Sequence, residues 1–204
     1  MASDLPGLVV FLAVMTGTPG PANMLLVGAA ARHGPAAAAP FALGVILGMQ
    51  VVTWPAGLGL MELAARAPAV FEALRWLCAA YIVWLAWQIA GARVGGGDTA
   101  VRAPGFGRGL LVHPLNPKAW AIASGAFTQF VPAGAAPLAA TAGMAGLMLL
   151  VGAALQGIWF WGGGGIARAI AGHPAERWTM RALGVLTVLA VFWALLAGPA
   201  PVAR

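Results

Sequence analysis

The sequence predicts an all-α integral membrane protein, a single domain (residues 1–204) of six transmembrane helices arranged as two inverted three-helix halves. Three observations predict this fold: the composition, the spacing of the apolar runs, and a break inside the first and fourth runs. Hydrophobic residues make up 61% of the chain and charged residues 8%, and the mean hydropathy is +0.89. Because a soluble domain of this length has a far more polar balance, most of this apolar surface is expected to face lipid.

The positions of the apolar runs predict the spans. A membrane-spanning helix needs about 20 mostly apolar residues. The first candidate run opens without a basic segment and exceeds signal-peptide length, so we interpret it as a retained span. The six candidate runs lie at about 5–31, 37–61, 69–92, 109–131, 137–161 and 180–198.

The connection at about 93–108 is the longest predicted loop and the midpoint of the chain. It contains a Gly-rich stretch and a proline, and it separates half one (about 1–93) from half two (about 109–204). Each half has an odd number of predicted spans, so the second half enters the membrane in the opposite sense to the first. Any structural kinship between the halves would therefore make them inverted repeats.

The arginines predict the orientation. One side of the membrane carries seven: Arg32, Arg93, Arg102, Arg108, Arg168, Arg177 and Arg181. The other side carries three: Arg66, Arg75 and Arg204. Because cytoplasmic loops carry an excess of Lys and Arg, we expect the first side to face the cytoplasm. The protein is thus predicted to be a multi-pass protein of the cytoplasmic membrane with both termini outside.

The basic balance does not indicate a nucleic-acid partner. The formal net charge is +6 and the isoelectric point is near 11.4. The arginines, however, are scattered over short loops and are not interleaved with aromatic residues as on a nucleic-acid platform. We interpret the positive charge as a consequence of membrane topology. The protein is expected to lie in the lipid bilayer.

Two helix breaks occupy roughly corresponding places in the two halves. Residues 17–23 (GTPGPAN) interrupt the first apolar run, and residues 113–118 (HPLNPK) interrupt the fourth. Proline lacks a backbone N–H and clashes with the preceding turn, and glycine adds backbone freedom, so both runs are expected to be broken helices. In a membrane protein, paired breaks of this kind are the best sequence indication of a transport site.

The breaks predict a site for a zwitterion. A new half-helix begins near Ala22 and another at Pro117, and their free amides would meet from opposite sides as two positive dipole ends. Lys118 adds a full positive charge, while unwound carbonyls near residues 17–20 can accept hydrogen bonds from an ammonium group. No acidic residue lies in mid-membrane, so an amino acid with a neutral side chain is favoured over a dibasic one.

Candidate site residues follow from these breaks and from polar positions at similar inferred depth. For proton coupling the candidates are Lys118 and His113. The further polar positions Thr53 and Gln156 are plausible orienters of a substrate. Candidates for substrate binding are Thr18, Pro19, Gly20, Pro21, Asn23, Gln50, Asn116, Pro117 and Lys118.

Simpler interpretations of the same residues stay open. The first break is also compatible with a kink that only serves packing, and Asn116-Pro117-Lys118 with an ordinary helix start at the membrane surface, where the lysine snorkels. The Gly44-x-x-x-Gly48 pair lets two helices approach closely, either within one chain or in a homodimer, and the sequence does not choose.

The residues do not indicate an enzyme. The three histidines lie in separate segments without metal-ligand spacing, and Cys78 is the single cysteine, so neither a catalytic group nor a metal site is expected. The glycine run at 162–165 follows no strand and precedes no phosphate-binding lysine, so we interpret it as a flexible helix end. No cofactor is expected.

The residues of the two breaks carry a family resemblance. The matching stretches are 18–23 (TPGPAN), 25–27 (LLV), 31–34 (ARHG), 43–48 (LGVILG), 105–111 (GFGRGLL), 115–119 (LNPKA) and 129–131 (QFV). In this order and spacing they cover about a third of the chain, which resembles the lysine-exporter (LysE/RhtB) family of bacterial amino-acid efflux transporters. The chain departs from the family pattern at His113-Pro114, which places a second proline just before Asn-Pro-Lys.

The resemblance implies a six-helix carrier that exports amino acids or close derivatives outward, by exchange with protons. The expected function is therefore secondary transport of an amino acid, with a neutral substrate favoured. The alternative is a channel or a membrane subunit that does not transport, in which the polar residues would line a pore or make an assembly contact.

Overall fold

The computed structural model describes residues 4–59, 68–91, 103–132 and 134–196, and every element in these ranges is helical. Most of the predicted loop at about 93–108 lies outside the described residues, as do Arg66, Arg93, Arg102 and Arg204. The described helices are α1 (Leu5–Gly17), α2 (Pro21–His33), α3 (Pro35–Gly57), α5 (Pro68–Ala90), α6 (Phe106–Leu110), α7 (Pro117–Phe130), α8 (Pro137–Ile170) and α9 (Ala175–Leu196).

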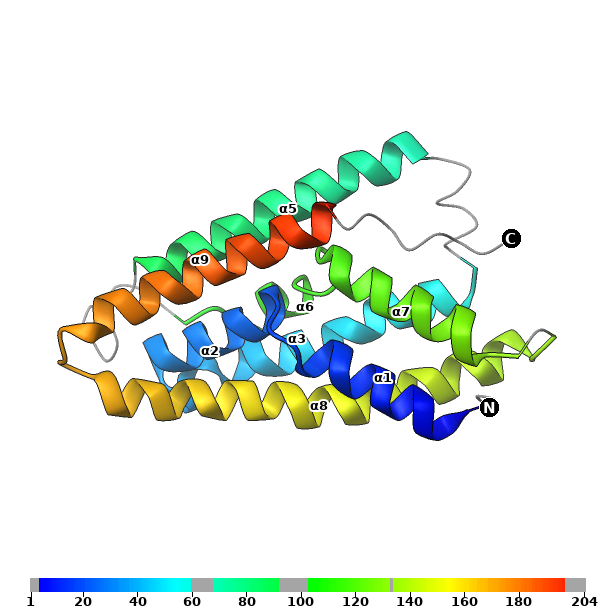
Figure 1. The fold of residues 1–204 in the computed structure, drawn as a ribbon, viewed down its shortest axis with the longest axis horizontal. Helices are drawn as coiled ribbons and strands as arrows, with labels where there is room; N and C mark the ends of the chain where they lie inside the picture. Colours follow the sequence, from blue (N-terminus) through cyan, green and yellow to red (C-terminus); the bar gives the residue numbers. More distant parts are fainter. Residues whose placement is uncertain (1–3, 60–67, 92–102, 133, 197–204) are drawn as a thin grey trace.

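The first predicted break is present. Helices α1 and α2 bend by 53° across a short extended segment (Figure 1). By length and composition, α3 and residues Pro137–Ile166 of α8 can each cross a membrane, and α1 with α2 makes a third candidate as one broken span. The second predicted break is also present, because α6 ends at Leu110 and α7 begins only at Pro117.

The glycine run at 162–165 is not a helix end, contrary to the sequence-based interpretation, because α8 continues through it to Ile170. A Cβ added at Gly163 would lie 2.5 Å from the carbonyl oxygen of Val27, and one at Gly164 would lie 2.7 Å from Cγ of Pro35. The run is therefore helical, and two of its glycines let α8 pass close to α2 and to the start of α3.

Helix α9 begins at Ala175, before the predicted start near residue 180. Polar groups in the preceding turn satisfy the first backbone amides: Nδ1 of His173 accepts from the amide of Ala175 at 3.1 Å. In addition, Oε2 of Glu176 accepts from the amide of Gly172 at 3.1 Å. Hydropathy marks only the apolar part of a helix, and it therefore predicts a later start than this polar first turn.

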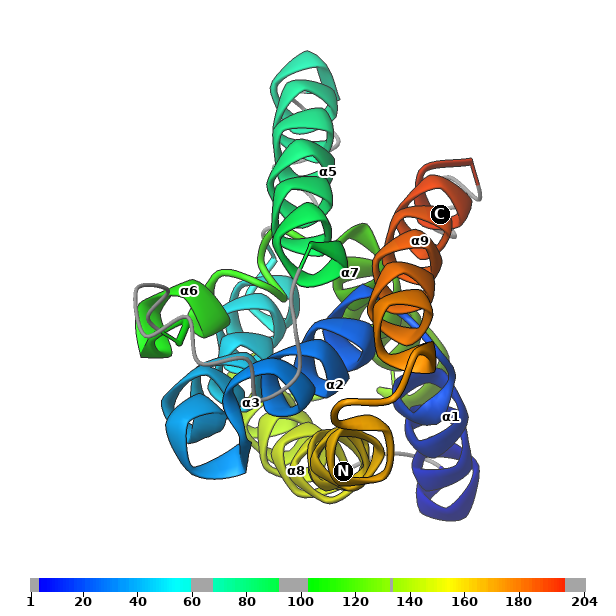
Figure 2. The same cartoon turned by 90° about the vertical axis from the view of Figure 1, so that its left-hand side faces the viewer.

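Helix α2 lies at the centre of the molecule. Every residue from Pro21 to Ala31 is buried. Helices α3, α5, α8 and α9 all contact α2, and Figure 2 shows it enclosed by the other elements. Helix α5 packs mainly against α9, and in Figure 2 it stands away from the rest of the bundle. The fold therefore buries one half of the broken first span from Pro21 to Ala31 and leaves only its last two residues partly exposed.

Glycines bring α3 and α6 into backbone contact. A Cβ on Gly44 would overlap the carbonyl oxygen of Phe106, and one on Gly109 would overlap that of Phe41. A Cβ on Gly48 would lie 2.6 Å from the carbonyl oxygen of Leu110. The Gly44-x-x-x-Gly48 pattern thus serves packing within one chain, the first of the two uses that the sequence left open.

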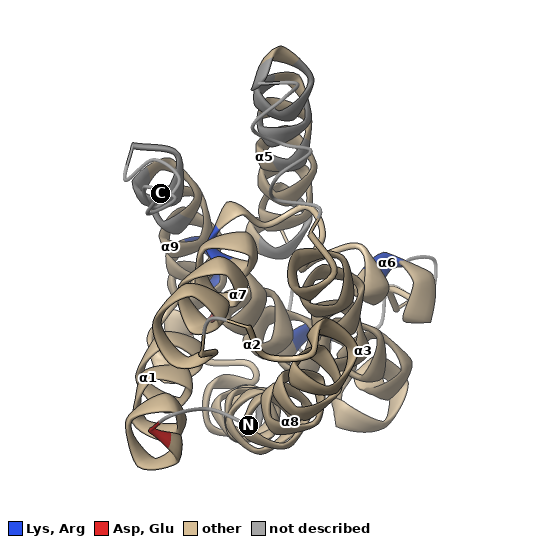
Figure 3. Cartoon of the chain, turned by 90° about the vertical axis from the view of Figure 1, so that its right-hand side faces the viewer, with Lys and Arg blue, Asp and Glu red and all other residues tan. Residues whose placement is uncertain are grey.

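The helix ends gather at two poles. In Figure 1 the α2–α3 turn, the end of α5 and the α8–α9 turn lie at the left-hand end, whereas the start of α1 and the α7–α8 connection lie at the right. Figure 3, viewed from the right-hand end, shows the acidic position at the start of α1 and the Lys and Arg positions away from it. Arg32 lies in the last turn of α2, and Arg177 and Arg181 lie near the start of α9, so these arginines belong to helix ends at the left-hand pole of Figure 1, whereas Asp4 caps α1 at the right-hand pole.

Candidate functional site

The first break is held open by the side chain of Asn23. Helix α1 makes its last backbone hydrogen bond from the amide of Thr18 to the carbonyl of Val14 at 3.0 Å. Nδ2 of Asn23 then donates to the carbonyl oxygens of Thr16 at 2.8 Å and Thr18 at 3.0 Å. These bonds satisfy carbonyls at the end of α1 that a broken helix would leave without a donor. Asn23 therefore stabilises the break itself.

The start of α2 keeps free amides. Gly20 precedes the helix in an extended conformation, Pro21 occupies the first helical position, and no side chain caps this end. The first intrahelical bond runs from the amide of Met24 to the carbonyl of Gly20 at 3.0 Å. The amides of Ala22 and Asn23 precede it, so this buried helix end presents the positive end of its dipole.

The second break is capped by its own residues. Asn116 is the N-cap of α7, and its Oδ1 accepts from the amide of Lys118 at 3.0 Å. Nε1 of Trp120 donates to the carbonyl of Pro114 at 2.9 Å, which ties the preceding loop to α7. This helix start therefore has fewer free donors than that of α2, and its contribution to a site lies mainly in the side chain of Lys118.

Lys118 joins the two breaks. Its Nζ donates to Oγ1 of Thr18 at 2.9 Å and to the carbonyl oxygen of Thr18 at 3.3 Å. A Cβ added at Gly20 would lie 3.0 Å from this Nζ, so the glycine leaves the room that the ammonium group occupies. Residues 100 positions apart in the chain thus form one polar centre.

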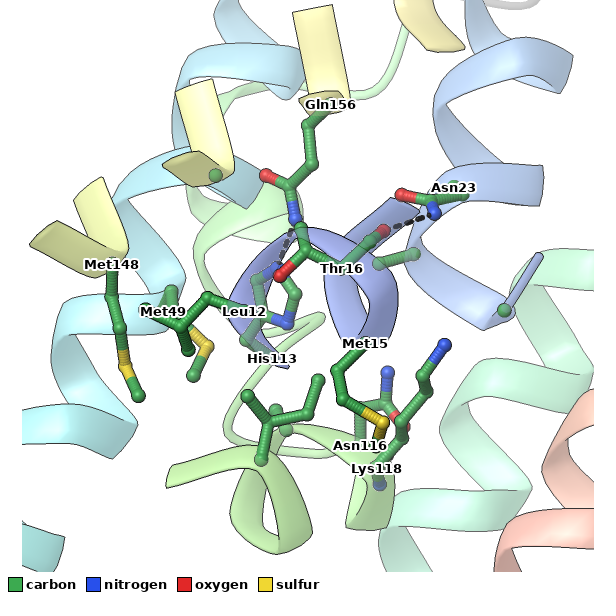
Figure 4. Close-up of a pocket in the computed structure, with 15 residues that line it drawn as sticks. Leu12, Met15, Thr16, Asn23, Met49, His113, Asn116, Lys118, Met148 and Gln156 are labelled. Atoms are coloured by element: carbon green, nitrogen blue, oxygen red, sulfur yellow. Dashed lines mark hydrogen bonds between the residues drawn. The ribbon is translucent and has the colours of Figure 1, made fainter. Parts of the chain in front are cut away.

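A small cavity of about 30 Å³ lies between the breaks. That volume accommodates about one or two water molecules. Figure 4 shows the side chains that surround it, with polar groups on part of the wall and methionines on another. The lining residues are Leu12, Met15, Thr16, Gly20, Ala22, Asn23, Met49, His113, Asn116, Lys118, Ala119, Ile122, Met148, Gly152 and Gln156.

A buried polar pair occupies one wall of the cavity. Nε2 of Gln156 lies 2.7 Å from Nε2 of His113, and the two residues are only 3% and 6% exposed. Nδ1 of His113 and Oε1 of Gln156 have no hydrogen-bond partner among the residues that the structure describes. Gln156 comes from α8 and His113 from the loop before α7, so the pair connects two elements (Figure 4).

The structure brings most of the predicted site residues together. Gly20, Asn23, Asn116, Lys118 and His113 all line the cavity. Four further predicted residues lie close to these lining residues in the sequence. Thr18 is exposed and bonded to Lys118, and Pro19 is exposed. Pro21 is the first residue of α2, and Pro117 is the first residue of α7.

Two other polar positions lie outside the cavity lining. Nε2 of Gln50 donates to the carbonyl of Ala145 at 3.1 Å, so this predicted binding residue links α3 to α8. Oγ1 of Thr53 donates to the carbonyl of its own helix at Met49, at 2.9 Å.

Sequence reasoning missed Thr16 and the methionines Met15, Met49 and Met148 as lining residues. Each sits inside an apolar run, and the sequence alone does not show which face of the helix meets the cavity. Within the described ranges, no group of three or more His, Cys, Asp or Glu side chains could hold a metal ion.

Comparison with known proteins identifies the family. Residues 13–198 match the family described as LysE type translocator. The cysteine/O-acetylserine efflux proteins of Salmonella choleraesuis (strain SC-B67) and Salmonella typhimurium (strain LT2) are each 31% identical over 160 residues, which cover 78% of this chain and 77% of theirs. The protein of the same name from Escherichia coli (strain K12) is 29% identical over the same length. No solved structure matches the chain. Because the family match extends over nearly the whole sequence, the chain belongs to the LysE type translocators, a family of multi-pass membrane transporters and not of enzymes.

Proposed function

We propose that this protein is a secondary transporter that exports small neutral amino acids or close derivatives across the cytoplasmic membrane in exchange for protons. The observation that carries the proposal is the contact between Lys118 Nζ and Thr18 Oγ1 at 2.9 Å, which joins the two helix breaks at one cavity. A site formed between two halves of a transporter opens to alternate sides when the halves rock against each other.

The polar wall of the cavity fits a zwitterion. The ammonium group of Lys118 and the uncapped amides of Ala22 and Asn23 can bind a carboxylate, because both place positive charge at the start of α2. The carbonyl oxygen of Thr16 has a second lone pair beyond the bond from Asn23, and can accept from an ammonium group.

The rest of the lining favours a small neutral side chain. Among the residues that the structure describes, no Asp or Glu lines the cavity, so a second positive charge on the substrate would have no counter-charge from them. Methionine side chains adapt to ligands of slightly different shape. The relatives are named cysteine/O-acetylserine efflux proteins, and this name refers to small amino acids with neutral side chains. It therefore supports a small neutral substrate. A cavity of about 30 Å³ has to widen to admit such a molecule, as in a carrier that opens and closes.

The topology belongs to the same proposal. We infer six spans, formed by α1 with α2, α3, α5, α6 with α7, α8 and α9, in two inverted halves with both termini outside. Support comes from the breaks in the first and fourth of these, and from the charge asymmetry between the two poles. For proton exchange the candidate groups are Lys118 and His113, which line the same cavity.

Flux into or out of proteoliposomes tests the proposal. With purified protein and a pH gradient, labelled serine or cysteine should move saturably and protons should move in the opposite direction. Protein-free liposomes and the Lys118→Met variant are the controls, and both should show little flux. Flux that does not saturate and moves no protons would favour the channel alternative.

The anion site has a separate test. An amino-acid methyl ester keeps the ammonium group but lacks the carboxylate that Lys118 and the start of α2 are proposed to bind. The ester should therefore compete with labelled serine at least about tenfold more weakly than free serine, since a hydrogen bond to a charged group contributes about 1.5–3 kcal/mol. Equal competition would rule out carboxylate binding at this centre.

A further inference from the structure

The buried pair of His113 and Gln156 has hydrogen-bonding capacity that the protein does not use. The two nitrogen atoms Nε2 lie 2.7 Å apart, and neither Nδ1 of His113 nor Oε1 of Gln156 has a partner. Buried polar atoms are almost always hydrogen-bonded. Two unpartnered atoms on neighbouring side chains therefore indicate a place where a polar group of a ligand can bind. Both residues line the cavity between the helix breaks.

The free capacity is one donor and one acceptor. When Nε2 of Gln156 donates to Nε2 of His113, the neutral imidazole carries its proton on Nδ1, so Nδ1 is a free donor and Oε1 of Gln156 a free acceptor. When the amide is turned over, Oε1 accepts from the imidazole, and the free groups become the amide donor and the Nδ1 acceptor. Either arrangement suits a group that both donates and accepts, or an acceptor alone.

This pair is separate from the charged centre of the site. Gln156 reaches His113 from α8, whereas Lys118 enters from α7 and bonds to Thr18 (Figure 4). A substrate whose carboxylate lies at Lys118 and the start of α2 extends its side chain toward other walls of the cavity. Those walls consist of methionine and aliphatic side chains and a glycine, apart from the His113–Gln156 pair, Thr16 and Asn116, whose Oδ1 already accepts from the amide of Lys118.

We propose that His113 and Gln156 recognise the side chain of the substrate, and that they select small amino acids with a hydroxyl, thiol or ester carbonyl over aliphatic amino acids of equal size. This inference rests on the proposed amino-acid transport and names the substrate class more closely. The selection is physical: an aliphatic side chain entering the cavity would leave both buried polar atoms unpaired, whereas a polar side chain pairs at least one of them.

The experiment compares serine and cysteine with 2-aminobutyrate, which replaces the hydroxyl or thiol by a methyl group. Binding is measured as ligand-induced stabilisation of the purified protein, and transport as flux in proteoliposomes. The wild-type protein should prefer serine and cysteine over 2-aminobutyrate by at least about tenfold. Equal binding of all three by the wild-type protein would overturn the inference without any variant.

The double variant His113→Leu/Gln156→Met removes both unpartnered atoms and keeps similar volumes, so it should fold at least as well as the wild type. Its preference for serine over 2-aminobutyrate should disappear or reverse. The matched control is Thr187→Val, which removes a buried hydroxyl that bonds to the carbonyl of Leu183 within α9, outside the cavity lining, and should leave the preference ratio unchanged.

The outcomes separate this inference from the proposed function. A double variant that keeps the wild-type preference overturns it, and shows instead that the pair holds a water molecule or serves packing. A switched binding preference in the double variant, together with no flux of any amino acid through the wild-type protein, would overturn the transport proposal and leave the recognition role standing. Flux through the wild-type protein, together with an unchanged preference ratio in the double variant, would overturn the recognition role and leave the transport proposal standing.

Discussion

At the scale of single residues, the two helix breaks differ in how their backbone amides are satisfied. The start of α7 is capped by Asn116, whose side chain accepts from the amide of Lys118, whereas no side chain caps the start of α2. The two breaks therefore contribute different chemistry to one centre: α2 contributes backbone amides, and α7 contributes the ammonium group of Lys118. The proposed carboxylate of the substrate would be stabilised by both, because amide dipoles and a full charge act together at short range.

Lys118→Met is expected to reduce export by about 10- to 100-fold, because a hydrogen bond to a charged group contributes about 1.5–3 kcal/mol. Membrane insertion should be kept, since removing a charge from a span lowers the cost of insertion. The measurement is amino-acid flux at equal protein abundance in the membrane. Lys118→Arg should also be impaired, because the planar guanidinium places its charge elsewhere.

Thr18→Val serves as a milder comparison, because the carbonyl of Thr18 still accepts from Lys118 at 3.3 Å after the hydroxyl is lost. Wild-type flux in Lys118→Met would assign this lysine to a structural role at a helix start.

Gly20→Ala should lower transport without a large loss of stability. The backbone at Gly20 is extended (φ −165°), which any residue adopts, but the new Cβ would lie 3.0 Å from Nζ and 3.3 Å from Cδ of Lys118. The ammonium group would have to leave its present position, and small displacements at a binding centre can cost about 100-fold in rate. The measurement is flux together with the midpoint of thermal unfolding in detergent.

Gly146→Ala is the matched control, because no atom lies within 4 Å of the Cβ added there. That variant should keep both flux and stability. Unchanged flux in Gly20→Ala would mean that the position of the Lys118 ammonium does not matter for transport.

At the scale of elements, backbone contact between α3 and α6 anchors the start of the second broken segment. Gly44 and Gly48 on α3 face Phe106 and Leu110 of α6, and Gly109 of α6 faces Phe41 in return. Helix α6 has only five residues, which is too short to be stable alone. Its position therefore depends on this contact, and on the hydrogen bond from the hydroxyl of Tyr81 to the carbonyl of Arg108 at 3.3 Å.

Gly44→Ala should destabilise the protein by about 1–3 kcal/mol, the usual cost of overpacking, because the Cβ would overlap the carbonyl of Phe106 and backbone cannot rotate away. Thermal unfolding in detergent is the measurement, and the midpoint temperature of Gly44→Ala should be lower than that of the wild type. Gly143→Ala on α8 has open space around its Cβ and should not lower that temperature. Equal stability of the two variants would show that α6 is held by other contacts.

At the scale of the whole molecule, the helix ends collect at two poles, as Figure 1 shows. The α8–α9 turn carries Gly172 at one pole, and the α7–α8 connection carries Ala135 at the other. Because cytoplasmic segments carry an excess of Lys and Arg, we expect the pole rich in arginine to face the cytoplasm. The two positions are therefore expected on opposite sides of the membrane.

Cysteine labelling in intact cells checks this orientation. In a background without Cys78, a membrane-impermeant thiol reagent should label Ala135→Cys from outside and should label Gly172→Cys only after the cells are opened. The reverse pattern would invert the proposed topology and turn the proposed export path around. Labelling of both from outside would contradict the arrangement of helices altogether.

The membrane class, both helix breaks and the polar cavity residues other than Thr16 could be predicted from the sequence. Composition alone indicates a lipid environment, and Pro and Gly interrupt a helix wherever they cluster, because their backbone restrictions are local. The family resemblance to LysE-type transporters is confirmed by the match over residues 13–198. The number of spans could not be established to the same degree, since the described helices that meet the length and apolarity test account for up to three.

What the sequence by itself determined is where the chain breaks and which charges are available, because both depend on the residue and its immediate neighbours. Only the tertiary structure decided how these parts combine. In the folded chain, Lys118 donates a hydrogen bond to Thr18, which lies 100 positions away in the sequence. His113 pairs with Gln156, and the amide of Gln50 links α3 to α8. Such contacts depend on the rotation of each helix about its axis and on which helices are neighbours. Those are set by packing of the entire bundle, and an apolar run carries little information about them.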